Sequence, residues 1–247
     1  MLPRFHINLR LREGDELGLP PGVARHVQVL RLQPQAAITL FNGDGGEWAA
    51  SVVRMGHNEV TVRIGAFAAV DRELPQRVTL ALGMPANERM DALVEKATEL
   101  GVAAIQPLHC ERSVLRLSGE RASKKVVHWR GVAQAACEQS GRTRLLVIEP
   151  VRTLHEWLDT LPHGDDAQRL LLSLNKTPAS ARGSASPTLC LSGPEGGLTE
   201  AEEAAALQHG FSPITLGARV LRADTAPLAL LAHLALSWQT NFQQGTG

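Results

Sequence analysis

The chain of 247 residues carries no excess of charge of either sign, because 25 Lys and Arg residues balance 25 Asp and Glu residues. Binding to nucleic acid through an overall positive charge is therefore not expected. A long apolar run is also missing: the most apolar stretch, Ala226–Leu236, is about half a membrane span and contains His233. The first residues, Met1–His6, lack the apolar core of a signal peptide. We expect a soluble, cytoplasmic protein that does not contact a membrane.

Cysteine is scarce, and Cys110, Cys137 and Cys190 lie far apart. None forms a CxxC pair or a His/Cys cluster, so we expect reduced, buried thiols and no metal site. GxGxxG, Walker A, GxSxG and HExxH signatures are absent. Ser173–Lys176 matches SxxK, a pattern that four residues match too easily by chance. The sequence therefore gives little support for a hydrolase or for an enzyme that acts on nucleoside triphosphates.

The composition is that of a globular protein, with 44% hydrophobic and 20% charged residues. Short runs rich in Val, Ile, Thr, Phe and Trp, with alternating polar residues, occupy the first part of the chain: Ala37–Phe41, Glu47–Val53 and Glu59–Ile64. The glycine cluster at Asn42–Gly46 leads into a strand, which favours a hairpin turn over a phosphate loop. Residues 1–70 therefore predict a small β-barrel-like domain with a short helix near Pro21–Val29.

After a polar, proline-containing linker at 71–76, short apolar runs alternate with helical patterns. The expected strands are Val78–Leu82, Val102–Pro107, Leu145–Ile148, Leu170–Leu174, Thr188–Leu191 and Ile214–Leu216. The expected helices are one with Leu93, Val94, Ala97 and Leu100 on a single face, then Glu120–Gln139, Thr153–Thr160, Thr199–Gln208 and Thr225–Thr240. This alternation predicts an α/β domain whose mostly parallel sheet is covered on both faces.

The balanced total charge conceals an uneven distribution. Residues 101–152 hold nine basic and four acidic side chains, whereas residues 153–247 hold five and nine. A basic middle segment therefore remains compatible with a nucleic-acid partner.

A glycine-rich turn follows an apolar strand at Ser192–Leu198, and Thr199 with Glu202 has the spacing of a capping box for the next helix. Such a turn exposes backbone groups at the carboxyl end of a strand, where open α/β sheets bind ligands. A tight connection without a ligand is the alternative.

The segment Leu216–Ala226 repeats this layout, with a strand that ends at Gly217 and a helix capped by Asp224 or Thr225. Val220 and Leu221 are apolar residues between charged arginines. They either line a slot for a flat ring or fill the core.

Two Glu–Arg pairs lie in the basic segment, at Glu111–Arg112 and at Glu138–Arg142. Such pairs are often structural ion pairs. Arginine forks near Gln and Ser also suit phosphates and nucleobase edges.

Taken together, five motifs in order resemble the RsmE family of small-subunit (16S) ribosomal RNA uracil-N3 methyltransferases, of the SPOUT superfamily. They are Lys96–Val102, Glu111–Ser113, Ala136–Arg142, Gly193–Gly197 and Leu216–Arg222, with further agreement at Pro3–Phe5 and Arg25–Arg31.

The resemblance implies a PUA-like RNA-binding β-barrel domain at 1–72 and a SPOUT methyltransferase domain at 77–247. The latter would contain a deep trefoil knot at roughly 168–240, a topology that sequence rules alone do not predict. It also implies S-adenosyl-L-methionine as methyl donor, 16S ribosomal RNA as substrate, a role in ribosome biogenesis, and a homodimer to which Thr225–Thr240 contributes.

The resemblance further assigns site residues. Cofactor binding falls to Leu172, Ser173, Leu174, Ser192, Gly193, Pro194, Glu195, Gly196, Leu216, Gly217, Val220, Leu221 and Arg222. The catalytic candidates are Arg222, Arg112 and Arg142, which would stabilise the uracil anion, and Glu138 or Glu111 as base. RNA would contact Arg4, Arg25, His26, Arg31, Arg89, Arg112, Gln139 and Arg142.

Two positions depart from the family pattern. Asp224 stands where the family usually has Glu, and Met84–Met90 lacks the extra glycines and lysines common there, leaving Arg89 as its one basic residue. Three alternatives stay open at this point: a SPOUT enzyme for another RNA, one for a ribose 2′-hydroxyl, or an inactive knotted assembly protein.

Overall fold

The computed structural model describes residues 2–57, 59–173 and 186–244, which divide into two compact units. Residues up to Glu73 and the segment Gln134–Leu145 form the first unit. Leu74–Ala133 and the residues from Leu146 onward form the second. The sequence does not predict that Gln134–Leu145 packs with the N-terminal strands, because a contact between segments so far apart in the chain leaves no local pattern.

The first unit contains a five-stranded sheet in the order β1-β3-β4-β5-β2 and one helix, α1 (Pro21–Val29). The strands are β1 (Arg4–His6), β2 (Glu16–Gly18), β3 (Ala37–Phe41), β4 (Glu47–Met55) and β5 (Val60–Ala68). β3 and β4 pair antiparallel across Asn42–Gly46, which confirms the hairpin and leaves no phosphate loop there. Alternate residues of these strands, with Ala24 and Val27 of α1, form the core of this unit.

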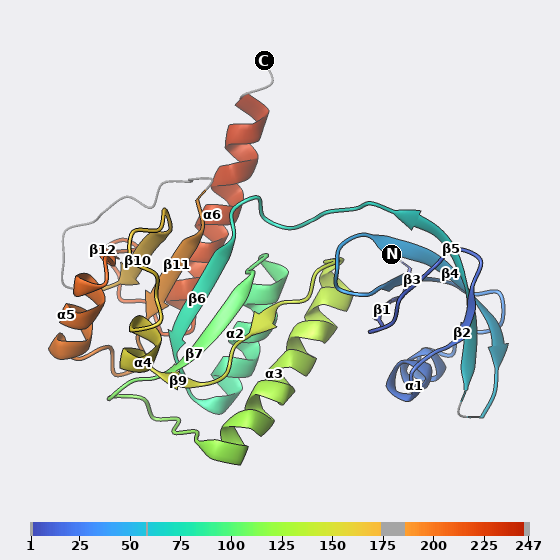
Figure 1. Ribbon diagram of the computed structural model, residues 1–247, viewed down its shortest axis with the longest axis horizontal. Helices are drawn as coiled ribbons and strands as arrows, with labels where there is room; N and C mark the ends of the chain where they lie inside the picture. The colour runs from blue at the N-terminus through green and yellow to red at the C-terminus, as the bar shows by residue number, and fades with distance from the viewer. Residues whose placement is uncertain (1, 58, 174–185, 245–247) are drawn as a thin grey trace. The chain divides into compact units, whose positions relative to one another are not determined.

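The second unit is built on a parallel sheet in the order β12-β10-β11-β6-β7-β8, with β9 also paired to β7 (Figure 1). Its strands are β6 (Val78–Gly83), β7 (Ala104–His109), β8 (Val147–Ile148), β9 (Arg152–Thr153), β10 (Gln168–Leu172), β11 (Thr188–Ser192) and β12 (Ser212–Ile214). Its helices are α2 (Asn87–Glu99), the part of α3 (Gly119–Ser140) up to Ala133, α4 (Leu154–Leu158), α5 (Glu200–Gln208) and α6 (Thr225–Gln244). The predicted α/β class is confirmed.

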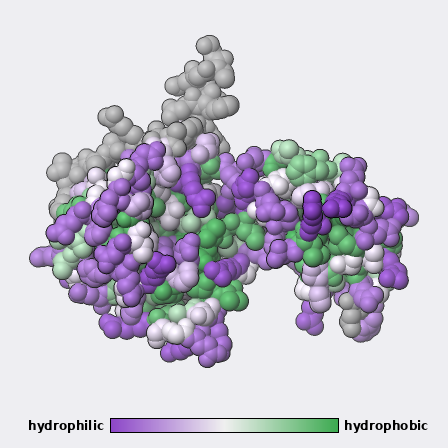
Figure 2. Space-filling model, viewed as in Figure 1, coloured by the Kyte–Doolittle hydropathy of each residue, from purple (hydrophilic) through white to green (hydrophobic). Residues whose placement is uncertain are grey.

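Both faces of this sheet are covered, because neighbouring residues of a strand point to opposite sides. Leu170 and Cys190 belong to the cluster shared with α2, α3 and α6, whereas Leu171 and Leu191 belong to the cluster shared with α4 and α5. Figure 2 shows hydrophilic residues spread over the visible faces, with hydrophobic ones in smaller areas between them. None of the helices in the described part of the chain is long and apolar enough to span a membrane.

The prediction differs from the structure at a few strands. The last strand lies at Ser212–Ile214 rather than at 214–216, so Leu216 and Gly217 belong to the loop that follows it. Three short strands, β1, β2 and β9, have two or three residues each and carry too little alternation to be recognised. The predicted knot includes residues 174–185, outside the described residues, and it stays a prediction.

Two of the three cysteines offer a chemical test of this core. Burial raises the pKa of the Cys190 thiol to about 12. Burial, together with the nearby Glu202 carboxylate, raises the pKa of Cys110 to about 12. Since the thiolate is the reactive form, a raised pKa keeps both thiols neutral and inert at neutral pH.

We therefore expect iodoacetamide at about pH 8 to leave Cys110 and Cys190 unmodified in the folded protein and to label both after unfolding. Peptide mass spectrometry measures the labelling. Equal labelling rates before and after unfolding would contradict the buried positions.

Candidate active site

A candidate site is a cavity of about 790 Å³ within the second unit, at the carboxyl ends of its parallel strands. Three loops line it: the residues after β10, the turn after β11, and the segment between β12 and α6. Because all these strands run in the same direction, their carboxyl ends meet at one edge of the sheet, where open α/β sheets bind ligands. Its volume is in the range of about 300–1,000 Å³ common for small-molecule sites.

The lining combines apolar side chains with backbone polar groups. Leu172, Ile214, Leu216, Val220 and Leu221 line the cavity, together with the backbone of Ser192–Gly197. Val220 is 75% exposed, so it does not fill the core. The structure therefore agrees with the other role considered for Val220 and Leu221, which is to line a slot for a flat ring. A slot of this kind suits a flat aromatic ring that also makes hydrogen bonds to the main chain.

Two glycines give the loops their shape. A Cβ on Gly193 would lie 2.9 Å from the backbone nitrogen of Leu198, so a larger residue would force the turn open. Gly217 has a φ of +100°, a conformation that side-chain-bearing residues rarely adopt, and a Cβ there would meet nothing within 4 Å. The first glycine closes the turn and the second one allows the chain to reverse beside the cavity.

The side chain of Glu202 holds the glycine-rich turn in place through hydrogen bonds to the main chain. Its carboxylate accepts hydrogen bonds from the backbone N–H of Thr199 at 2.9 Å and of Glu111 at 2.9 Å. The Thr199 hydroxyl in turn accepts the N–H of Glu202 at 3.3 Å, which completes the predicted capping box. This 2%-exposed carboxylate therefore joins the loop after β11 to the loop after β7.

Glu195 connects the same turn to the loop after β6. It accepts the backbone N–H of Ala86 at 3.0 Å and lies 3.4 Å from the guanidinium of Arg89. Arg112 donates to the carbonyls of Gly196 at 3.1 Å and Leu198 at 3.3 Å. Three loops, which follow the neighbouring strands β11, β6 and β7, are thus held together by side-chain hydrogen bonds.

The predicted cofactor residues gather in this cavity. All of them that the structure describes line it, whereas Leu174 lies outside the described residues. The cavity also takes in residues that the sequence did not single out, among them Glu203, Ile214 and Arg219. Glu203 is 3.2 Å from the hydroxyl of Ser173 and comes from α5, whose sequence marks it only as a solvated helix residue.

The predicted catalytic residues divide between the two units. Arg112 and Arg222 line the cavity, whereas Glu138 and Arg142 belong to the first unit. There Glu138 accepts the backbone N–H of His6 at 3.0 Å, and Arg142 is buried in an ion pair with Glu73. Neither residue lines the cavity, and Glu111 is not among its lining residues, so their catalytic roles stay predictions.

The predicted RNA contacts of the first unit differ in exposure. Arg25, His26, Arg31 and Gln139 are exposed. Arg4 is buried, forms an ion pair with Glu47 and donates to the carbonyls of Gly141 and Arg142 at 3.1 Å each. Its side chain therefore fastens Gln134–Leu145 to the sheet.

Glu47 is shared between two arginines in this unit. A hydrogen bond from Arg72 is the main cause that lowers the pKa of Glu47, and the contact with Arg4 adds to it. The carboxylate thus stays ionised in the fold, as its two cationic partners require.

Asp224, the departure from the family pattern, immediately precedes α6. Its Oδ1 atom is buried and has no hydrogen-bond partner, so this carboxylate does not satisfy the helix end through that atom. The neighbouring residues Ala223 and Ala226 line the cavity. Among the described residues, no cluster of three His, Cys, Asp or Glu side chains is placed to hold a metal.

Comparisons with known proteins agree with this geometry. A family model described as an RNA methyltransferase domain matches residues 72–235, and one described as an RNA methyltransferase PUA domain matches residues 19–65. The parallel α/β unit and the N-terminal sheet thus belong to the class of RNA methyltransferases that carry a PUA domain.

Comparison with individual relatives identifies the family within this class. The ribosomal RNA small subunit methyltransferase E of Bacillus subtilis is 30% identical over 99% of both chains. The crystal structure of this enzyme from Neisseria gonorrhoeae, bound to S-adenosylmethionine, is 37% identical with a TM-score of 0.90, covering 96% of this chain and 98% of that one. A methyltransferase of Legionella pneumophila in complex with the same cofactor is 32% identical, with a TM-score of 0.89 and the same coverage. The chain belongs to the ribosomal RNA small subunit methyltransferase E family, as the resemblance predicted.

The role of Glu202 leads to a stability test. Glu202→Ala removes the helix cap and leaves the partly buried backbone N–H of Glu111 without its acceptor. We expect a loss of about 2 kcal/mol in unfolding free energy, or about 4–8 °C in Tm by calorimetry.

The matched control is Glu200→Ala, an exposed carboxylate in the first turn of the same helix. Its effect should stay at or below about 1 kcal/mol, since only the helix dipole is involved. Equal losses in the two variants would contradict the specific role of Glu202.

Proposed function

We propose that this protein transfers a methyl group from S-adenosyl-L-methionine to N3 of a uridine in the 16S ribosomal RNA of the small subunit. The observation that carries the proposal is the cavity at the sheet edge, where the glycine-rich turn, Leu216–Arg222 and the end of β10 converge. Two similar structures are described with S-adenosylmethionine bound, and the matching relatives are named as small-subunit ribosomal RNA methyltransferases.

The residues of the cavity fit this cofactor. Leu172, Leu216, Val220 and Leu221 would hold the adenine, whose edge can bond the exposed main chain of the two loops. Glu203 and Ser173 supply polar groups for the ribose or the amino-acid part. The bound cofactor supplies an electrophilic methyl group on a sulfonium sulfur.

The chain's own task is to present N3 of the uracil as a nucleophile. The N3–H is a weak acid; during transfer its proton passes to solvent water, the N3–methyl bond forms and the sulfonium–methyl bond breaks, which leaves a neutral thioether. Negative charge then spreads over O2 and O4 of the ring. The guanidinium of Arg222, at the cavity wall, would stabilise that charge. Arg112 holds the glycine-rich turn through two carbonyls and so fixes the distance between the two reactants.

The proposal also covers the rest of the chain. The first unit would act as a PUA-like RNA-binding domain, with the exposed Arg25, His26 and Arg31 on the RNA. The second would be a knotted SPOUT domain that works as a cytoplasmic homodimer. Light scattering of the purified protein tests the dimer, and a monomer at micromolar concentration would exclude it.

The reaction itself is tested by deleting the gene and analysing ribosomal RNA nucleosides by mass spectrometry. We expect N3-methyluridine to disappear from 16S RNA and to return with a plasmid copy. If instead a 2′-O-methyl nucleoside or a modification of another RNA is lost, the enzyme acts on a different atom or substrate. An unchanged nucleoside profile would contradict an enzymatic role.

The role of Arg222 is tested by Arg222→Ala. We expect kcat to fall about 10²–10³-fold, because one donor to a developing anion is lost. Calorimetric binding of S-adenosylmethionine should change far less than kcat. Arg222→Lys should recover part of the rate, since it keeps the charge but not the planar fork. An unaltered kcat in Arg222→Ala would remove this residue from the mechanism.

A further inference from the structure

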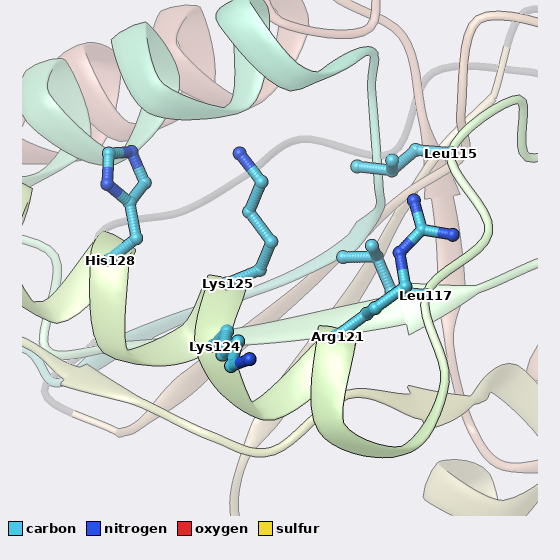
Figure 3. A pocket seen from close by; sticks show the side chains of 6 residues that line it. All are labelled: Leu115, Leu117, Arg121, Lys124, Lys125 and His128. Carbon is cyan, nitrogen blue, oxygen red and sulfur yellow. The ribbon is translucent and has the colours of Figure 1, made fainter.

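A second cavity, of about 320 Å³, lies beside the first half of α3. It shares no lining residue with the cavity of the candidate active site, which we call the methyl-donor cavity because of the proposed function. Its lining consists of Leu115, Leu117, Arg121, Lys124, Lys125 and His128, so no carboxylate faces it. Figure 3 shows Lys125 and His128 extending from the same side of α3, with the guanidinium of Arg121 beside the two leucines. We call this set of six residues the α3 pocket.

The cations of the α3 pocket form one face of the helix. Arg121, Lys124, Lys125 and His128 are spaced three, four and seven residues apart, which brings them to one side of an α-helix. From Arg121 to His128 the helix rises by about 10 Å. Positive groups spread over this length suit a ligand with several phosphates in a row better than a single small anion.

Two of these cations lack a protein partner. Lys124 lies 2.9 Å from Glu120, and His128 accepts or donates a hydrogen bond at 2.8 Å to Asp91. Arg121 and Lys125 make no hydrogen bond or ion pair with any described residue. Lys125 is partly buried, and its side chain lines the cavity.

The floor of the pocket is apolar, which distinguishes it from an ordinary solvated helix face. Leu117 is buried and Leu115 is half-buried, and both face the same space as the cations. A nucleotide matches this pairing, because its phosphate is anionic and its ribose and base offer surfaces that pack on apolar side chains.

The position of the α3 pocket relates it to the reaction. The loop between β7 and α3 supplies Arg112 to the methyl-donor cavity and, three and five residues later, Leu115 and Leu117 to the α3 pocket. The two cavities therefore share one loop as part of their lining, which places the second beside the proposed path of the RNA.

We infer that the α3 pocket is a second RNA-binding site, which holds the sugar–phosphate backbone of a nucleotide outside the one that is methylated. Arg121 and Lys125 bind the phosphates, and Leu115 and Leu117 support the ribose or base. The inference rests on the proposed RNA substrate and adds contacts that the reacting uridine does not make.

The test compares the full-length protein with the double variant Arg121→Ala/Lys125→Ala. The probe is an unmodified 16S RNA transcript, bound in a fluorescence anisotropy titration at several salt concentrations. We expect affinity at low salt to fall about tenfold and the slope of log K against log salt to shrink by about 1.4–1.8, as two phosphate contacts are lost. The charge-keeping Arg121→Lys/Lys125→Arg variant should restore both.

The control variant is Lys96→Ala, which removes an exposed cation of α2 that pairs with Glu95 and Glu99 and does not line the pocket. It should leave the transcript affinity within about twofold of the wild type. Equal affinity and salt slope in the double variant and in Lys96→Ala would overturn the inference. The inference would also be overturned if inorganic phosphate alone accounted for the contacts that the double variant loses, because the pocket would then be a site for a small anion.

Two further readouts separate the possible failures. If the double variant binds the transcript normally but loses affinity for purified small subunits, the pocket contacts a ribosomal protein and the RNA assignment is wrong. S-adenosylmethionine binding by calorimetry should be unchanged in all variants. If wild-type protein shows the expected slopes yet never methylates RNA, the proposed function fails while the inference stands.

Discussion

The common direction of the strands in the second unit is the constraint on which its site depends. When neighbouring strands are parallel, their carboxyl ends and the loops that follow lie at a single edge. Segments that are far apart in the chain, near Arg89, Arg112, Ser173, Gly193 and Arg222, therefore line one cavity. An antiparallel arrangement of the same strands would send alternate loops to opposite edges and would disperse these residues. The chemistry of the site is thus a consequence of sheet direction before it is a property of any side chain.

Loops at a sheet edge still need to be held in place, and carboxylates perform this task here. Glu202 and Glu195 each accept hydrogen bonds from loops that follow other strands. Charged acceptors are suitable because their hydrogen bonds to backbone N–H groups are stronger than those of neutral groups. The acidic excess of residues 153–247 therefore includes side chains that support the loops from within. The same holds for Arg4 and Arg142, whose positive charges are buried against Glu47 and Glu73 in the first unit.

The sequence was sufficient for the features that depend on local chemistry. The Asn42–Gly46 hairpin, the Thr199–Glu202 capping box and helix α1 follow from residues that touch each other in the chain, and the structure has all three. The loops that line the cavity were also predicted to lie together, because glycine turns after apolar strands are a local pattern. The packing of Glu138 and Arg142 was not predicted, because a Glu–Arg motif has the same appearance in a buried ion pair and at an open site. The burial of Arg142 and the hydrogen bond from the backbone N–H of His6 to Glu138 are visible only in the structure.

Charge illustrates the same limit for the partner. The basic excess of residues 101–152 is real, but its members are used differently: Arg112 and Arg130 donate to backbone carbonyls, and Arg142 is buried. Arg121 and Lys125 of α3 have no hydrogen bond or ion pair with any described residue and line the α3 pocket, so they are placed to meet an external anion. A count of charges cannot distinguish a cation that supports a loop from one that faces a ligand. The relevant quantity is the number of cations that have no described partner and line a cavity. Arg121 and Lys125 are such cations on α3, and the loop before α3 also supplies Arg112 to the cavity of the candidate active site.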